Sequence, residues 1–448
     1  MRSKKQYYIR TFGCQMNVHD SEQMEELLRN EGFCSTGDDK SADLIIVNTC
    51  SIREKAEQKV YSILGRYRGL KQARPDLIIG VGGCMAQQQG TDLFARAPHL
   101  DFIFGTHTIH RLPEMIKEVE RNRRRLVDTC FHDSVQSIGI VAPPRGGSVS
   151  SFVTIMQGCN NFCSFCVVPY VRGREESREI YDIVNEIEVL TRHGVKEVIL
   201  LGQNVNSYGN TLNNGANFPL LLKEINGVDG IERIRFITSH PKDLSDGLIE
   251  CFAVLDKVCE HIHLPVQSGS DTMLRRMNRR YTAGDYLGKV EKLREACPRI
   301  SISTDIIVGF PGESEEDFQK TIDLMEKVRF DSSFSFKYSV RPGTMAERYE
   351  DRIPESVKQD RLMKVQKLQE RYTLEGNESL KGSVEDILVE GLSKNSSADV
   401  TGRTRTNRIV NFPGGTGLIG ERVYVRIQNT YIHSLRGELV EKERNWQC

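Results

Sequence analysis

The amino-acid sequence predicts an α/β protein built of a parallel sheet, a partial β/α barrel and a small antiparallel β-barrel, in that order. In the first third of the chain, short apolar runs alternate with segments of helical period. Six more strand-like runs alternate with helices over the next ~190 residues. The last part alternates apolar and polar residues between Gly and Asn turns, as small barrels do. A length of 448 residues suits about three such parts.

The first part is expected to be a sheet of flavodoxin or Rossmann type. Its strands are predicted over 7–13, 43–49, 76–83 and 100–106. The second and third are continuous Leu/Ile/Val runs, typical of strands buried on both faces. A helix over 51–69 carries one apolar stripe, formed by Ile52, Ala56, Val60, Ile63, Leu64 and Tyr67. A shorter helix is expected around Met24, Leu27 and Leu28. Strands separated by helices at this spacing indicate parallel pairing with right-handed crossovers.

Three of these four strands are followed directly by a cysteine. Cys14, Cys50 and Cys84 hold these positions, whereas the fourth strand ends without one. Open α/β sheets bind their ligands at the carboxyl ends of the strands. We therefore expect the three thiols to converge on one metal or cofactor site. The alternative is three ordinary core cysteines, since free cysteine is among the most buried residue types.

The middle part is expected to form an open (β/α)6 barrel. Its strands are predicted over 152–156, 196–202, 233–238, 261–266, 300–309 and 333–339, and its clearest helices over 178–190 and 312–328. Loops rich in Gly, Ser, Asn or Gln follow the strands, where such barrels carry their chemistry. Each loop alone is ordinary turn chemistry. Together they surround one mouth.

The loop GCNNFCSFC follows the first barrel strand and holds Cys159, Cys163 and Cys166. A structural zinc site needs four protein ligands. A redox pair of Cys163 and Cys166 would leave Cys159 unexplained. A [4Fe-4S] cluster normally takes four cysteines, so a cluster on three leaves one iron open to a small molecule.

Composition narrows the function further. Lys+Arg and Asp+Glu both total 61, so the net charge is zero and any RNA-binding surface must be local. Twelve cysteines without an apolar segment after MRSKK favour metal or redox chemistry over a disulfide framework. No run of apolar residues is long enough to span a bilayer. We expect a cytoplasmic protein with no membrane partner.

The CxxxCxxC spacing after a barrel strand resembles the radical S-adenosylmethionine (SAM) superfamily, in which an aromatic such as Phe165 precedes the last cysteine. The segments TFGCQMNVHDSE, NTCSIREKAEQKVYSILG, VGGCMAQ and MQGCNNFCSFCVVPYVRGREESR resemble the methylthiotransferases, and most closely their MiaB branch, which acts on tRNA. The branch that modifies a ribosomal protein tends to carry LGCPKN where this chain has FGCQMN.

The resemblance implies two [4Fe-4S] clusters. The first, on Cys159, Cys163 and Cys166, would bind SAM and generate a radical that takes hydrogen from C2 of N6-dimethylallyladenosine beside the tRNA anticodon. The second, on Cys14, Cys50 and Cys84, would supply a methylated sulfur. No side chain is expected to act as a catalytic acid or base, because the cofactor carries the difficult step. The implied partners are the tRNA anticodon loop, an electron donor and a sulfur source.

Three other functions stay open on the sequence. Two belong to the same family and would methylthiolate threonylcarbamoyl-adenosine in tRNA or an aspartate of a ribosomal protein. The third is a non-catalytic, metal-containing RNA-binding protein.

The resemblance also suggests which residues hold SAM. Gln203 and Asn204 stand where the superfamily often has Gly-Gly-Glu to meet the methionine amine. The implied contacts are Phe165, Gln203, Asn204, Ser239, His240, Gln267, Ser268, Ile307 and Gly309. The alternative for each polar one is a capped turn or a paired core group.

After a charged helical connector over 353–380, the last part resembles the TRAM domain, an RNA-binding module. Its expected RNA contacts are Arg403, Arg405, Arg408, Phe412, Tyr424 and Arg426. The alternative is a solvated arginine face. Arg172, Arg174 and the run over 121–125 could extend the RNA track. The expected domains are a methylthiotransferase domain over 5–122, a radical SAM domain over 145–375 and a TRAM-like domain over 378–441.

Overall fold

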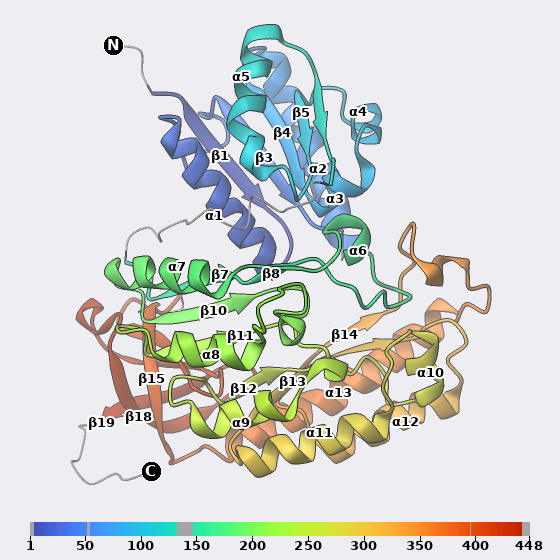
Figure 1. Cartoon of the computed structure of the whole chain (residues 1–448), viewed down its shortest axis with the longest axis vertical. Helices are drawn as coiled ribbons and strands as arrows, with labels where there is room; N and C mark the ends of the chain where they lie inside the picture. The colour runs from blue at the N-terminus through green and yellow to red at the C-terminus, as the bar shows by residue number, and fades with distance from the viewer. Residues whose placement is uncertain (1–3, 52–53, 132–146, 395, 441–448) are drawn as a thin grey trace.

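The computed structural model describes residues 4–51, 54–131, 147–394 and 396–440. Ile52, the side chain of Ala56 and the predicted domain limits 145 and 441 lie outside the described residues. Figure 1 shows the amino-terminal sheet at the top, the central strands and helices below it, and the carboxyl-terminal barrel at the lower left. Within the described residues, no helix is long and apolar enough to cross a membrane.

The amino-terminal part is a six-stranded parallel sheet in the order β2-β1-β3-β4-β5-β6. Its strands are β1 (Gln6–Thr11), β2 (Cys34–Ser35), β3 (Leu44–Thr49), β4 (Ile78–Gly83), β5 (Phe102–Phe104) and β6 (Leu126–Asp128). This order is that of flavodoxin-like sheets, extended by one strand. The order reverses between β1 and β3, and at that point such folds bind their ligands.

Helices cover both faces of this sheet. They are α1 (Gln15–Asn30), α2 (Glu54–Ala73), α3 (Cys84–Gln89), α4 (Asp92–Arg96) and α5 (Leu112–Asn122). One face packs on α1 and α5 through Met24, Leu28 and Met115, and the other on α2 through Val60, Leu64 and Tyr67. The helix around Met24 was expected to be shorter than the next one, and α1 has 16 residues against 20 in α2.

The central part contains the six predicted barrel strands. They are β7 (Ser150–Thr154), β10 (Glu197–Leu201), β11 (Arg233–Phe236), β12 (His261–His263), β13 (Ser301–Val308) and β14 (Ser332–Lys337). All neighbours are parallel, in two sheets of three, β11-β10-β7 and β12-β13-β14. A parallel bridge between Ile234 and Val258 joins the sheets into one open arc.

Helices lie outside this arc. They are α7 (Ile180–Arg192), α8 (Phe218–Asn226), α9 (Asp246–Val254), α10 (Asp271–Arg276), α11 (Ala283–Ala296) and α12 (Glu315–Val328). The short α6 (Val168–Val171) lies instead against the amino-terminal sheet, beside α3 (Figure 1). A short antiparallel pair, β8 (Met156–Gln157) with β9 (Glu176–Ser177), closes the cysteine loop. Alternate strand residues such as Leu200, Ile234 and Ile306 enter the core beneath the helices, so Glu197, Arg233 and Arg235 point to the inner side.

The helix α13 (Glu355–Glu378) packs along β14 and leads to a closed five-stranded barrel in the order β15-β16-β17-β19-β18. Its strands are β15 (Val384–Leu392), β16 (Asp399–Thr404), β17 (Ile409–Pro413), β18 (Arg422–Thr430) and β19 (Leu435–Val440). The pairing is antiparallel as expected, except that β17 and β19 close the barrel in parallel.

The carboxyl-terminal barrel is docked on the amino-terminal end of the central strands. Arg233 is fully buried and donates to the carbonyls of Arg403 and Asp386 and to the Asp386 carboxylate. Arg235 pairs with Glu197 at 2.7 Å and donates to two further carbonyls of this barrel. The joint therefore closes the end of the arc opposite the cysteine loop.

Candidate functional site

The cysteine loop is held in place mainly by its backbone. The Ser164 N–H donates to the Met277 carbonyl at 3.0 Å, and the Asn278 amide donates to the carbonyls of Asn161 and Phe162. The Cys166 N–H donates to the Cys163 carbonyl at 2.9 Å. The turn from Cys163 to Cys166 and its support on α10 turn the cysteine side chains toward one place.

Burial sets the protonation of two of these thiols in the metal-free protein. It raises the pKa of Cys159 to about 11 and that of Cys166 to about 12, the latter with a contribution from the charge of Cys163. Loading a cluster must therefore displace protons from this loop.

Two cationic or polar groups approach Cys163. The buried Arg279 guanidinium donates to its Sγ at 3.5 Å and to the Pro265 carbonyl at 2.7 Å. The His240 Nε2 lies 4.0 Å from the same sulfur. Burial, with the charge of Arg279, holds the pKa of His240 far below its usual range, so this imidazole is neutral. Arg279 was not among the predicted site residues, because an arginine in NRRYT resembles an ordinary surface basic run.

Backbone strain gathers around the same mouth. Phe162, Thr238, Gln267, Asn278 and Arg280 all have positive φ, between 48° and 71°. Such a conformation is unusual for residues other than glycine, and for a β-branched threonine it is a clear outlier. Strained residues cluster at functional sites, where the surrounding structure enforces them.

Several buried polar atoms at this mouth have no hydrogen-bond partner within the described residues. They are Thr154 Oγ1, Gln157 Nε2, Glu175 Oε1, Asn206 Oδ1, Ser239 Oγ and Gln267 Oε1. Glu175 directly precedes β9, and the others lie at or after the carboxyl ends of β7, β8, β10, β11 and β12. An unpaired buried polar atom is costly. A ligand with amine, carboxylate, hydroxyl and heterocyclic groups would satisfy them, so the residues fit SAM.

The predicted SAM contacts fall into two groups. Ser239 and Gln267 carry unpaired atoms at the mouth. Gln203 and Asn204 are instead engaged within the protein: Gln203 accepts from the Gly158 N–H, while Asn204 accepts from the His240 N–H at 3.0 Å and donates to Asp243 at 2.7 Å. The Gln-Asn pair therefore fastens the cysteine loop to the next two strands.

The other predicted contacts lie on the far side of the mouth. Ser268 is fully buried and bonded to Thr321 and Ser270, which makes it a structural residue rather than a SAM contact. The Gly309 N–H is bonded to Glu313, and the Ile307 N–H to the Gln267 carbonyl. Phe165 is partly buried, edge-on to Phe310 with ring centroids 6.4 Å apart.

The thiols of the amino-terminal sheet also converge. Cys14, Cys50 and Cys84 follow β1, β3 and β4, which are adjacent in the sheet, and they flank the point where the strand order reverses. Cys50 and Cys84 are buried. A Cβ on Gly13 would lie 2.7 Å from the Cys50 Cβ, so the backbone before Cys14 is in close contact with Cys50.

Asparagine side chains tie these strand ends together. Asn17 accepts from the Cys14 N–H at 3.3 Å and donates to the Thr49 carbonyl at 3.2 Å. Asn48 donates to the Asn17 carbonyl at 2.8 Å. These buried amides therefore cross-link the segment that follows β1 to the end of β3.

Both thiol sets meet at one joint. Cys84 packs against Val167 and Val171, and Val167 directly follows Cys166. The Thr106 hydroxyl donates to the Val171 carbonyl at 2.6 Å. The two sets thus lie on either side of α6 and the residue before it.

Within the described residues, no group of three or more His, Cys, Asp or Glu side chains is arranged to hold a single metal ion.

The predicted RNA contacts need correction. Phe412 is fully buried in the barrel core, so it is not available to stack on a base. Arg405 pairs with Glu260 at 2.8 Å and Arg408 pairs with Asp331, so both serve the joint with the central part. Arg403 pairs with Glu390 at 3.0 Å.

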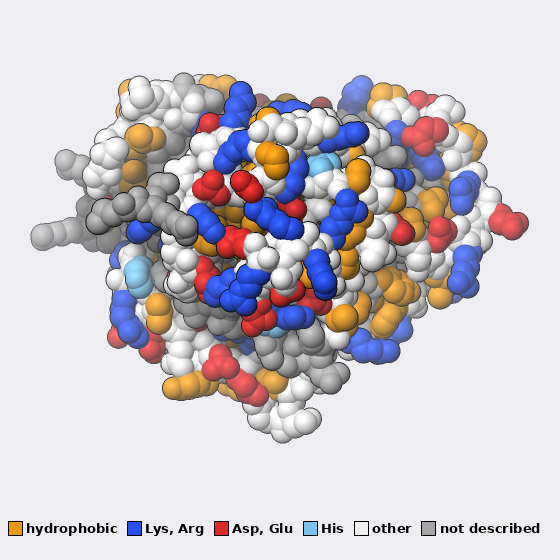
Figure 2. Space-filling view, turned by 90° about the horizontal axis from the view of Figure 1, so that it is seen from above, with side chains coloured by type: hydrophobic (Ala, Val, Ile, Leu, Met, Phe, Trp, Pro, Cys, Tyr) orange, Lys and Arg blue, Asp and Glu red, His pale blue; other side chains and the backbone are white. Residues whose placement is uncertain are grey.

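Arg426 is exposed and bonded only weakly to a carbonyl, at 3.3 Å, among the contacts described for it. Tyr424 is partly exposed on the same strand. Arg172 was expected to extend the RNA track, but it is buried against Asp20, whereas Arg174 is exposed. Figure 2 shows Lys and Arg side chains interspersed with Asp and Glu, so a basic surface on this face is local.

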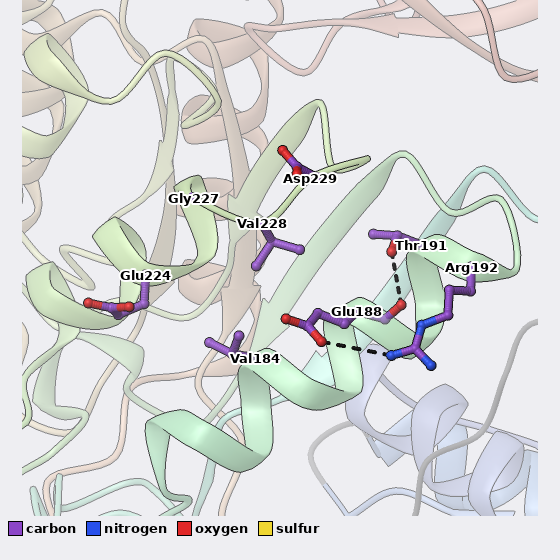
Figure 3. A pocket seen from close by; sticks show the side chains of 8 residues that line it. All are labelled: Val184, Glu188, Thr191, Arg192, Glu224, Gly227, Val228 and Asp229. Atoms are coloured by element: carbon purple, nitrogen blue, oxygen red, sulfur yellow. Dashed lines mark hydrogen bonds and ion pairs between the residues drawn. The ribbon is translucent and has the colours of Figure 1, made fainter.

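A separate surface hollow of about 420 Å³ lies between the ends of α7 and α8 (Figure 3). Its lining is Val184, Glu188, Thr191, Arg192, Glu224, Gly227, Val228 and Asp229. Both helix ends lead into the amino ends of β10 and β11, so the hollow lies away from the cysteine loop. Glu188 is paired with Arg192 at 3.8 Å.

Comparisons with known proteins agree with this geometry. Family models match residues 6–105 (Uncharacterized protein family UPF0004), 153–325 (Radical SAM superfamily) and 378–440 (TRAM domain). A radical SAM methyltransferase, TsrM of Kitasatospora setae, shares the fold, with a TM-score of 0.57 and 15% identity over 86% of this chain and 77% of that one. The fold and the cysteine loop define a radical SAM protein with an additional amino-terminal sheet and a TRAM barrel.

Full-length relatives narrow the class. A protein of Syntrophus aciditrophicus is 59% identical over 98% of this chain and 95% of its own length, and one of Geotalea uraniireducens is 52% identical over 98% and 100%. Both are named tRNA-2-methylthio-N(6)-dimethylallyladenosine synthase. The chain belongs to this family of radical SAM methylthiotransferases.

Proposed function

We propose that this chain converts N6-dimethylallyladenosine in tRNA to its 2-methylthio derivative, using two [4Fe-4S] clusters and SAM. The observation that carries the proposal is the meeting of two three-thiol sets at one joint, where Cys84 packs on the residue that follows Cys166. A reaction that joins a carbon radical to a sulfur atom needs both sources within reach of one substrate atom.

Each thiol set has a separate task in this proposal. Cys159, Cys163 and Cys166 hold the cluster that binds SAM, and the other three hold the second cluster. When bound, these groups supply the radical that removes the C2 hydrogen and the sulfur that replaces it. The protein orients the reactants and excludes water.

The surrounding residues hold the cofactor in place. Gln203 and Asn204 fix the cysteine loop, while Ser239 and Gln267 offer unpaired oxygens to SAM. Arg279 places its guanidinium beside the Cys163 sulfur, at 3.5 Å. Phe165, Ile307 and Gly309 line the remaining side through their apolar surface or backbone.

We assign the three predicted parts, 5–122, 145–375 and 378–441, to the second cluster, to SAM chemistry and to RNA binding. Arg426, Tyr424 and Arg174 are the retained candidates for RNA contact. Single-stranded anticodon loops expose C2, whereas a duplex hides it. The proposal also requires a reducing electron donor and a sulfur source, and it places the protein in the cytoplasm with tRNA.

Nucleoside mass spectrometry of tRNA tests the proposal. The protein is reconstituted anaerobically and incubated with SAM, a reductant and tRNA that carries dimethylallyladenosine. We expect a new 2-methylthio nucleoside and 5′-deoxyadenosine. If a methylthio group appears only on threonylcarbamoyl-adenosine or on ribosomal protein, the chain acts as a member of another branch of the methylthiotransferase family. Intact SAM with a fully loaded protein would contradict an enzymatic role.

A further inference from the structure

A buried ion pair crosses the joint between the amino-terminal sheet and the central part. The Arg172 and Asp20 side chains are 3% and 6% exposed, with Nη2 to Oδ2 at 2.5 Å and Nη1 to Oδ1 at 3.3 Å. This two-pronged geometry is the strong form of an arginine–carboxylate pair. Asp20 lies on α1, which starts directly after Cys14, and Arg172 directly follows α6.

The backbone around Arg172 is clamped as well. The Arg172 carbonyl lies 3.0 Å from His107 Nε2, and the preceding carbonyl accepts from Thr106. Cys84 packs on Val171, the residue next to Arg172. The guanidinium is therefore held in a fixed place beside the amino-terminal thiols although it comes from another part of the chain.

Geometry brings this pair to the thiol edge. Val171, the residue before Arg172, packs on Cys84, and Asp20 lies on the helix that starts directly after Cys14. Arg172 therefore brings a buried positive charge from the central part of the chain to the amino-terminal thiols.

We infer that Arg172 is a positioning residue for the second cluster: it locks the amino-terminal thiol edge onto the radical SAM loop and supplies a fixed positive charge that favours an anionic sulfur ligand at the open iron. The chemical class of that ligand is a hydrosulfide or an alkanethiolate. The inference rests on the proposed function, since it requires a cluster on Cys14, Cys50 and Cys84. Charge and hydrogen bonds near a cluster also set its reduction potential.

Substituting Arg172 and substituting Asp20 should change the properties of the second cluster in opposite directions, and this gives the test. In the full-length chain, Cys159, Cys163 and Cys166 are changed to alanine so that only the amino-terminal thiols can hold a cluster. Reconstituted protein is then compared with Arg172→Gln, Arg172→Lys and Asp20→Asn. The readouts are iron content, the midpoint potential, and the affinity for sodium methanethiolate measured by electron paramagnetic resonance of the reduced cluster.

Loss of the positive charge makes reduction harder. Arg172→Gln should lower the equilibrium constant for one-electron reduction of the cluster at least tenfold, which is a fall of about 59 mV in the midpoint potential. It should also weaken the binding of methanethiolate at least tenfold. Asp20→Asn removes a negative charge and should move both quantities the other way. Arg172→Lys, which keeps the charge, should stay closer to the parent than Arg172→Gln.

Arg178→Gln is the matched control, because Arg178 and Glu186 form an equally buried pair, 9% and 2% exposed, in the central part. It should leave both readouts unchanged. If Arg172→Gln and Asp20→Asn shift the potential in the same direction, or not at all, the charge has no such role and the inference is overturned. If Arg172→Gln fails to fold, the rise in midpoint potential and in methanethiolate affinity expected for Asp20→Asn is the deciding result. A parent protein that assembles no cluster would instead refute the proposed function.

Discussion

At the scale of single residues, the six cysteines of the two sets have distinct environments, and this predicts distinct losses. Cys163 lies against Arg279 and His240 in the cysteine loop, whereas Cys50 is buried at the end of β3. Under the proposed function, substituting Cys163 and substituting Cys50 remove ligands from different clusters.

Cys163→Ala should abolish the cleavage of SAM to 5′-deoxyadenosine, because its cluster can no longer bind SAM. Cys50→Ala should preserve that cleavage and abolish methylthio transfer to tRNA. Both products are measured by mass spectrometry in one reaction. Cys251→Ala is the control, since this buried thiol only donates to the Gly247 carbonyl within α9. Equal loss of both activities in Cys50→Ala would contradict the division of tasks.

The raised pKa values of the loop thiols predict slow alkylation of the metal-free protein. At pH 8, a thiol of pKa about 11 is only about one thousandth thiolate, the reactive form. Iodoacetamide should therefore modify Cys159 and Cys166 more slowly than the exposed Cys34, and their rates should keep rising to pH 10. Peptide mass spectrometry over a pH series measures each rate. Rates for Cys159 that level off near pH 8 would contradict the prediction.

Residue types with a recognisable spacing were predictable from the sequence, and residues that act through tertiary contacts were not. The placement of three cysteines in one loop and of three at the ends of adjacent strands could be predicted from the chain alone, and their role as cluster ligands stays a prediction. Arg172 and Arg279 could not, because nothing in a basic residue's sequence context says that it is buried. The same limit explains why Phe412 was wrongly predicted to contact RNA. Its side chain points into the barrel core, and which face of its strand points inward depends on the register of the barrel, which the sequence does not give.

At the scale of elements, two glycines of opposite kind decide how a segment can fold. Gly158 opens the cysteine loop with φ of 78°, and a Cβ there would lie 1.9 Å from the Arg174 carbonyl. Gly65 is exposed within α2, with nothing within 4 Å of the position of a Cβ.

Gly158→Ala should prevent the loop from closing, so that iron per chain falls by about half while the amino-terminal cluster still assembles. Gly65→Ala is the matched control, because the added Cβ has no atom within 4 Å. Alanine is favoured over glycine in a helix interior by about 1 kcal/mol, so this variant should keep its iron and melt at a higher temperature. Iron analysis measures the iron content of both variants, and circular dichroism measures their melting temperatures. Normal iron content in Gly158→Ala would show that the loop tolerates a Cβ.

The long apolar elements were predictable from period alone, since β3, β4, β7, β10, β11 and β13 lie within the expected runs or overlap them closely. The two-residue strand β2 and the three-residue β6 were missed, because segments so short carry no period. The parallel closure of β17 on β19 was missed for another reason: it depends on how the barrel wraps, which no local pattern records.

At the scale of the whole molecule, the fully buried Arg233 is one of the arginines that dock the TRAM barrel. Arg233→Met leaves two buried carbonyls without their donor, which costs about 1–3 kcal/mol for each group, while Asp386 keeps its pair with Arg422. The barrel should loosen, and trypsin should cut sooner between α13 and β15. Arg299→Met removes a pair with Glu385 at the same joint, but Arg299 is 66% exposed, so it should cost at most about 1 kcal/mol. Equal proteolysis rates for the two variants would contradict a joint held by Arg233.

The relative arrangement of the three parts was not predictable from sequence. It depends on side chains such as Arg172, Arg233 and Arg405, whose partners are 145 or more residues away in the chain. Sequence patterns describe each part alone, and the joints depend on pairs of residues that meet only after folding.

The docking of the TRAM barrel across the amino-terminal end of the central strands limits where molecules can enter and leave the interior. Arg233 and Arg235 are bonded to the backbone of residues 403–405, so among the described residues this end of the axis is covered. Molecules that reach the interior therefore come and go at the carboxyl ends of the strands. Under the proposed function, the arriving RNA and the departing methionine share that one opening, so the two compete for it.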